Sequence, residues 1–150
     1  MTEAVITLVV LAVLGGLAVP TYQGVRDGLE ENRQVITLSG YVAKARNIAA
    51  ESGNDYQYPA DTVDQLTDLD SRISGGASSG DIVSAWREDN DTVVFAGVAA
   101  DGRCYVVVDK ISSDQQHYAY DPSVLSCAAG GVDTMDVTGT LDEPNEIDLN

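Results

Sequence analysis

The sequence predicts an α+β protein in which a long N-terminal helix packs on a small antiparallel β-sheet. Three observations predict this fold class. Residues 4–25 contain no charged side chain. Apolar residues then recur mostly at spacings of three and four through residues 25–49, which is the period of an amphipathic helix. After residue 80, β-branched runs alternate with clusters of turn residues, as expected of short strands.

The uncharged segment, residues 4–25, is long enough to cross a bilayer, because about 20 helical residues span about 30 Å of hydrocarbon. A cleaved secretory signal would begin with basic residues, and no Lys or Arg precedes Arg26. A buried helix of a soluble protein would show a narrower apolar stripe. We therefore expect a membrane-capable helix of about 50 residues that ends at Gly53. Its apolar half should be exposed and its amphipathic half should pack on the sheet.

The charge is divided unevenly along the chain. Eight Lys and Arg stand against 24 Asp and Glu, for a net charge of −16, and residues 53–150 hold 19 of the acids but only four of the bases. This excess argues against direct nucleic-acid binding, which needs clustered bases on phosphates. One His and two Cys exclude zinc fingers and iron–sulfur sites. His117 has no Ser or Cys partner in a catalytic motif, so we expect neither an enzyme nor a cofactor.

The pattern divides the chain into an apolar half-helix (1–25), an amphipathic half-helix (26–53) and an acidic globular β part (54–150). The globular part should begin with a loop, 54–80, that contains a short helix over 62–70 capped by Asp61. Its strands should form an antiparallel meander of three or four members. We expect them at residues 81–87, 92–98, 104–109 and 116–120. The acidic tail, 130–150, is either mobile and solvated or contains a final edge strand around 137–141.

A charged residue at the head of the apolar segment is unexpected, and its spacing from a later proline indicates a family. Glu3 heads an apolar helix, and a carboxylate there is costly in lipid unless it lies at the interface or meets a cation. Pro20 follows Glu3 by 17 residues, Tyr22 comes two residues later, and residues 58–61 read Tyr-Pro-Ala-Asp. This arrangement resembles the type IV pilin and pseudopilin family, in which a glutamate precedes a proline by the same interval. The resemblance covers about the first 66 residues, and the remainder matches in layout alone.

The resemblance implies a pilin-like fold and an assembly mechanism. Residues 1–25 would leave the membrane and become the core of a helical homopolymer, with Glu3 facing the α-amino group of an adjacent copy. The family helix is often extended between a glycine and the proline, and Gly15, Gly16 and Pro20 have the composition for that. Family glutamates stand fifth in the mature chain, whereas this one is third. Either two residues precede Met1, or Met1 is a variant terminus.

The function implied by the resemblance is that of a structural subunit in an extracellular type IV pilus-like filament used in adhesion, motility or surface attachment. The alternatives are a pseudopilin of a type II secretion or DNA-uptake machine, or a minor pilin or membrane-anchored ligand-binding module. The implied partners are copies of the chain, the pilus assembly machinery and a prepilin peptidase. Before assembly the subunit would sit in the inner, cytoplasmic membrane.

Three further sites are candidates on the globular part. Cys104 and Cys127 form either a disulfide, which export would favour, or two free buried thiols, and the resemblance implies the disulfide. Asn90 begins an Asn-Asp-Thr glycosylation sequon. An acidic run usually forms a solvated face, but carboxylates are also the ligands that calcium prefers. The candidate calcium ligands are Asp142, Glu143, Glu146 and Asp148.

Overall fold

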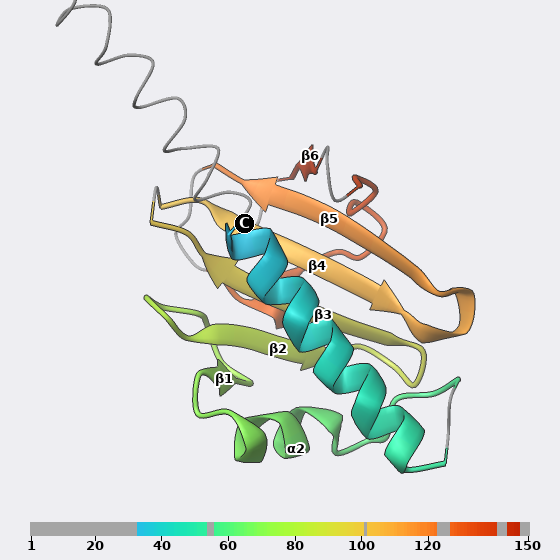
Figure 1. Ribbon diagram of the computed structural model, residues 1–150. Coiled ribbons are helices and arrows are strands. Elements are labelled where there is room, and N and C mark those ends of the chain that lie inside the picture. Colours follow the sequence, from blue (N-terminus) through green and yellow to red (C-terminus); the bar gives the residue numbers. More distant parts are fainter. Residues whose placement is uncertain (1–32, 54–55, 101, 123–126, 141–143, 148–150) are drawn as a thin grey trace, which may run out of the picture.

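The computed structural model describes residues 33–53, 56–100, 102–122, 127–140 and 144–147. Its centre is one six-stranded sheet in which the strands follow one another in chain order (Figure 1). The four central strands pair antiparallel, whereas the first and last strands pair parallel with their neighbours at the two edges. The strands are β1 (Ile73–Ser74), β2 (Val83–Arg87), β3 (Thr92–Val98), β4 (Cys104–Lys110), β5 (Gln115–Asp121) and β6 (Asn145–Glu146).

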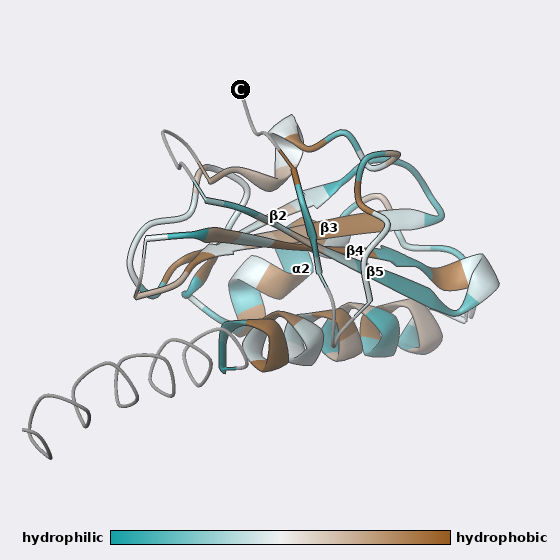
Figure 2. Cartoon of the chain, turned by 90° about the horizontal axis from the view of Figure 1, so that it is seen from above, coloured by the Kyte–Doolittle hydropathy of each residue, from teal (hydrophilic) through white to brown (hydrophobic). Residues whose placement is uncertain are grey.

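A helix over residues 33–51 lies across one face of the sheet, as Figure 2 shows. Its buried side chains recur every three or four positions, so they form one stripe that faces the sheet. These side chains are Val35, Leu38, Tyr41, Val42, Ala45, Ile48 and Ala49. The shorter helix α2 (Thr62–Leu69) packs beside β1 and β2, and two single turns, η1 (Ile111–Ser113) and η2 (Ala129–Gly131), complete the helical segments.

The sheet has a core on each face. Phe95, Tyr105 and Val107 belong to the core beneath the helix. Val94 and Val106, their neighbours in the strands, belong to a second core on the other face, which is covered by residues around Cys127, Ala129 and Val137. Strands β3 and β4 are therefore buried on both faces, which explains their nearly continuous apolar sequences.

The fold class predicted from the sequence was wrong. We expected one long N-terminal helix on a small antiparallel sheet of three or four strands, and the structure has a six-stranded mixed sheet. Its helices are shorter than predicted: within the described residues they are the segment 33–51 and the eight-residue α2. The edge strands β1 and β6 have two residues each, too few to leave a periodic signal. Residues 1–32, which would hold the rest of the predicted helix, lie outside the described residues.

Most of the helices and strands predicted after residue 60 are present in the structure. The helix expected over 62–70 is α2, and all four expected strands are present as β2 to β5, with bounds that differ by at most two residues. Asp61 makes no capping hydrogen bond, and its carboxylate instead accepts a hydrogen bond from Gln65 Nε2 at 2.9 Å. The tail contains the edge strand β6, which lies after the expected position at 137–141.

Candidate functional site

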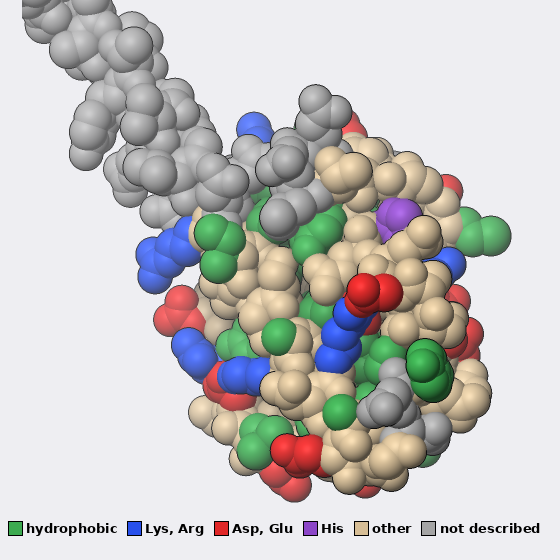
Figure 3. All heavy atoms as spheres, turned by 45° about the vertical axis from the view of Figure 1, so that its right-hand side comes forward, with side chains coloured by type: hydrophobic (Ala, Val, Ile, Leu, Met, Phe, Trp, Pro, Cys, Tyr) green, Lys and Arg blue, Asp and Glu red, His purple; other side chains and the backbone are tan. Residues whose placement is uncertain are grey.

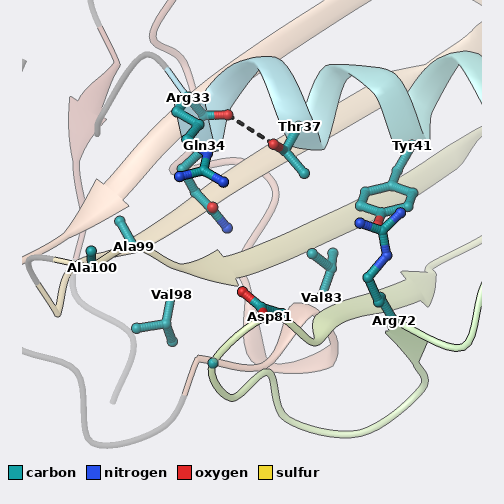
Figure 4. A pocket seen from close by; sticks show the side chains of 11 residues that line it. Arg33, Gln34, Thr37, Tyr41, Arg72, Asp81, Val83, Val98, Ala99 and Ala100 are labelled. Atoms are coloured by element: carbon teal, nitrogen blue, oxygen red, sulfur yellow. Dashed lines mark hydrogen bonds between the residues drawn. The ribbon is translucent and has the colours of Figure 1, made fainter. Parts of the chain in front are cut away.

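A cavity of about 410 Å³ opens between the first turns of the helix 33–51 and the adjoining ends of β2 and β3 (Figure 4). The helix forms its roof, and the chain before β2 forms its floor. The described residues that line it are Arg33, Gln34, Thr37, Tyr41, Arg72, Gly80, Asp81, Val83, Val98, Ala99 and Ala100. The lining therefore combines two guanidinium groups, one carboxylate and an apolar wall, a mixture suited to a polar or anionic guest.

Arg72 is held at the cavity by Asp70. Its Nε and Nη2 donate to the two oxygens of Asp70 at 3.0 and 2.8 Å, and Lys44 Nζ donates to the same carboxylate at 2.9 Å. These bonds, with that from Arg72 the largest, hold the pKa of Asp70 well below its usual range. Two cations thus share one anion, and Nη1 of Arg72 takes part in no hydrogen bond among the described residues. The group keeps a net positive charge beside the cavity.

Arg33 brings a second guanidinium from the first described turn of the helix. Its side chain is exposed and donates no hydrogen bond within the described part of the chain. Figure 4 shows Arg33 and Gln34 reaching down from the helix, with the Asp81 carboxylate below them. Figure 3 shows several Lys and Arg side chains on the left of this face and others at its centre and right, with carboxylates among them. The lining of the cavity therefore carries a net positive charge, although the chain as a whole is acidic.

The absence of a side chain at Gly97 shapes the cavity wall. A Cβ atom at this position would lie 2.1 Å from Nε2 of Gln34 and 3.4 Å from Cδ2 of Leu38. Gln34 therefore lies directly against the β3 backbone, in space that any other residue at position 97 would occupy. Glycine at position 97 thus leaves room for the amide group of Gln34 beside the cavity.

A buried ionic network fixes the helix on the sheet below the cavity. Asp109 on β4 is fully buried, and it accepts hydrogen bonds from Nε and Nη2 of Arg46 at 3.1 and 2.7 Å. Tyr58 also donates its hydroxyl to Asp109, and Asp114 pairs with Nη1 of Arg46. Burial, together with the bond to Asp109, raises the pKa of Tyr58 above its usual range. The network and the apolar stripe together fix the position of the helix on the sheet.

The disulfide is the one sequence-predicted site that the structure confirms. Cys104 at the start of β4 is joined to Cys127, with Cα atoms 5.5 Å apart. The bridge ties the segment that covers the second core to the middle of the sheet. The predicted assembly residues, in contrast, lie outside the described residues; they are Met1, Glu3, Gly15, Gly16 and Pro20.

The two weaker candidates stay predictions. Asn90 lies in an exposed turn between β2 and β3, where its side chain is accessible. Of the four candidate calcium ligands only Glu146 is described, and its carboxylate accepts a long hydrogen bond of 3.4 Å from Tyr120. Asp142, Glu143 and Asp148 lie outside the described residues. Within the described ranges, no three His, Cys, Asp or Glu residues are grouped so as to hold a metal ion.

Sequence reasoning missed the cavity and the network. Arg33 and Arg72 are far apart in the chain, and no motif joins them. Asp109 did leave a signal, because it follows Val107 at an inward-facing position of a strong apolar strand. An acid at such a position predicts a buried cationic partner.

Comparison of this chain with protein-family models, curated proteins and solved structures finds no match. Within the part of the chain that the structure describes, no helix has both the length and the apolar composition needed to cross a membrane. The uncharged segment 4–25 lies outside that part. The functional argument therefore rests on the residues and their geometry.

Proposed function

We propose that this chain is the repeating subunit of an extracellular type IV pilus-like filament, held in the membrane before assembly by its uncharged segment, residues 4–25. The observation that carries the proposal is how that segment joins the globular part. Only residues 26–32 separate it from the described helix, which is bound to the sheet by a desolvated ion pair and an apolar stripe. The helix 33–51 and the sheet, together called the head, are therefore held together as one unit.

The firm attachment of the helix supports a mechanical role. Bringing the uncharged segments of many copies together would arrange the heads at regular intervals only if each head were held firmly to its own segment. Arg46 and Asp109 supply one such connection, and the hydroxyls of Ser39 and Tyr118, 3.1 Å apart, supply another between the helix and β5. These contacts join the helix 33–51 to the rest of the head.

Two properties of the head agree with an extracellular position. The Cys104–Cys127 disulfide is of a kind that persists in oxidising surroundings and is rare in the cytosol. The net charge of −16 would keep assembled filaments apart by mutual repulsion. Both properties suit a surface structure.

Glu3 has a specific part in this proposal. Within a filament its carboxylate would meet the α-amino group of a neighbouring copy. Because a buried ion pair loses much of its attraction to desolvation, its main effect would be on register. Removing the carboxylate would leave the amino group buried without a partner, at a cost of roughly 3–5 kcal/mol.

The test is to shear producing cells, image the released material by electron microscopy and measure the intact mass of its main subunit. Thin filaments built mainly of this chain are expected. Glu3→Leu should enter the membrane yet yield no regular filaments, whereas the control Glu51→Leu, which removes an exposed acid at the end of the helix, should assemble normally. Normal filaments from Glu3→Leu would overturn the role of Glu3. Filaments of another protein, with this chain retained in the membrane, would favour a pseudopilin, a minor pilin or an anchored binding module.

A further inference from the structure

We infer that the cationic cavity binds carboxylates from the C-terminal segment of a second copy of this chain. The inference rests on the proposed filament function and names a contact that would hold neighbouring heads together. The cavity is the space lined by Arg33, Gln34 and Arg72 described above. Its proposed guest is the acidic edge, defined as the exposed carboxylates of Asp136 and Glu146.

Electrostatics favours such a contact. Copies that each carry a net charge of −16 repel one another, so a contact that brings opposite charges together is favoured over other contacts between heads. Arg33 and Arg72 line the cavity together with one carboxylate, that of Asp81. Beside the cavity, Lys44 and Arg72 share the carboxylate of Asp70. Residues 130–150, in contrast, contain acids and no Lys or Arg. The two regions are therefore opposite in charge.

The sheet topology makes the contact intermolecular. The acidic edge is tied to β6, because Asn145 accepts hydrogen bonds from the backbone of Thr138 and Gly139 and donates one to the carbonyl of Asp136. Four strand spacings separate β6 from β2, where the cavity lies, or roughly 19 Å at about 4.8 Å each. An acidic edge held in this way is out of reach of its own cavity, so its partner must belong to another copy.

The geometry of this contact suits a filament. A patch on one side of a subunit that binds a different patch on the opposite side makes a heterologous interface. Repetition of such an interface yields a ring when the rotation closes and an open helical polymer when it does not. The cavity at β2 and the acidic edge at β6 therefore provide a directional contact that adds to the packing of the uncharged segments.

The chemistry of the cavity matches a carboxylate guest. Guanidinium groups bind carboxylates through paired N–H donors, and Arg33 has all of its side-chain donors available within the described residues. Arg72 keeps Nη1 available while Asp70 fixes its plane. The amide of Gln34, which lies beside Arg33 in Figure 4, adds a neutral donor. One or two carboxylates can therefore be accepted together.

The first experiment measures the contact without filaments. A fluorescein-labelled synthetic peptide of residues 133–148 is titrated with the full chain in detergent micelles and followed by anisotropy. The control peptide has every Asp and Glu replaced by Asn and Gln. We expect the acidic peptide alone to bind, and Arg33→Gln and Arg72→Gln each to weaken it by about three- to tenfold. Binding should also weaken as salt rises from 0.05 to 0.5 M, since the contact is ionic.

Lys110→Gln is the matched control, because it removes one positive charge at the far end of β4 from the cavity. It should change the affinity by less than about twofold. The inference is overturned if neither peptide binds, if both bind equally, or if Lys110→Gln weakens binding as much as the two arginine variants. The tryptophan emission of each variant checks that it is folded.

A second experiment separates this inference from the filament proposal. Arg33→Glu should reduce the yield of sheared filaments, and combining it with Asp136→Lys and Glu146→Lys should restore part of that yield. Normal filaments from Arg33→Glu would overturn the inference and leave the filament proposal standing. Peptide binding by a chain that forms no filaments would instead overturn the filament proposal and leave the contact standing.

Discussion

Arg46 and Asp109 join the helix to the middle of the sheet through a two-pronged ion pair. The carboxylate is fully buried on β4, while the arginine side chain retains 27% of its exposure and lies at the boundary with solvent. Asp109 also accepts the hydroxyl of Tyr58, so three segments distant in sequence meet at one carboxylate. The bonds with Asp109 and Asp114 raise the pKa of Arg46 above its ordinary value, with Asp109 the larger contributor. Arg46 therefore stays charged at physiological pH.

Removing Arg46 should destabilise the head strongly. Arg46→Gln leaves the buried Asp109 carboxylate without its counter-ion, and such a change costs roughly 3 kcal/mol or more. The measurement is the free energy of unfolding of the full chain in denaturant. The double variant Arg46→Gln with Asp109→Asn removes both charges and should recover part of the loss. A single variant within roughly 0.5 kcal/mol of the parent would contradict the role given to the pair.

The Tyr58 hydroxyl should make stability fall in alkali. In the unfolded chain its phenol titrates near pH 10, whereas burial and the bond to Asp109 raise the pKa in the folded chain. The contribution is therefore complete below about pH 10 and is lost as pH rises beyond it. Tyr58→Phe should cost about 1–3 kcal/mol at pH 7. The difference between parent and variant should shrink at pH 10.5, and a constant difference across this range would contradict the assignment.

Loss of the disulfide should lower the free energy of unfolding of the head, because the bridge restricts the unfolded chain. The bridge between Cys104 and Cys127 spans 23 residues, and a loop of this length is worth about 3 kcal/mol in the chain-entropy description. The double variant Cys104→Ala with Cys127→Ala should unfold at lower denaturant by that amount. A phosphine reductant should shift the parent in the same direction and leave the double variant unchanged. Equal sensitivity of both proteins to the reductant would rule out the bridge as the cause.

Gly130 and Trp86 offer a local test of packing on the second face. A Cβ atom at Gly130 would lie 3.2 Å from Cδ2 of Trp86, whereas one at Gly131 would meet nothing within 4 Å. Gly130→Ala should therefore displace the indole, shift its emission and cost about 0.5–2 kcal/mol. Trp86 is the one tryptophan of the chain, so the signal is unambiguous. Gly131→Ala is the control, and an equal shift from both variants would contradict the packing described.

Sequence patterns located the central elements because their signals are local. Strands β3 and β4 are covered on both faces and are therefore almost continuously apolar, which can be recognised without knowing their neighbours. The same holds for α2, which has a periodic apolar side and polar flanks. The edge strands β1 and β6 are two residues long, and each exists because a neighbouring strand supplies its hydrogen bonds. The pattern contained no information on that pairing, so the predicted fold class was wrong.

The sequence by itself determined where the charge lies, that residues 4–25 are apolar, where the central strands run, and that two cysteines were available to pair. These properties belong to single residues or to short repeating patterns of apolar and polar residues. Only the tertiary structure decided that Arg33 and Arg72 share one cavity, that Asp109 is buried beneath Arg46, and that the acidic edge lies across the sheet from the cationic cavity. Such relationships depend on distances between segments remote in the chain. Those distances are set when the two apolar cores form, because the polar groups buried between the cores then need hydrogen-bond partners.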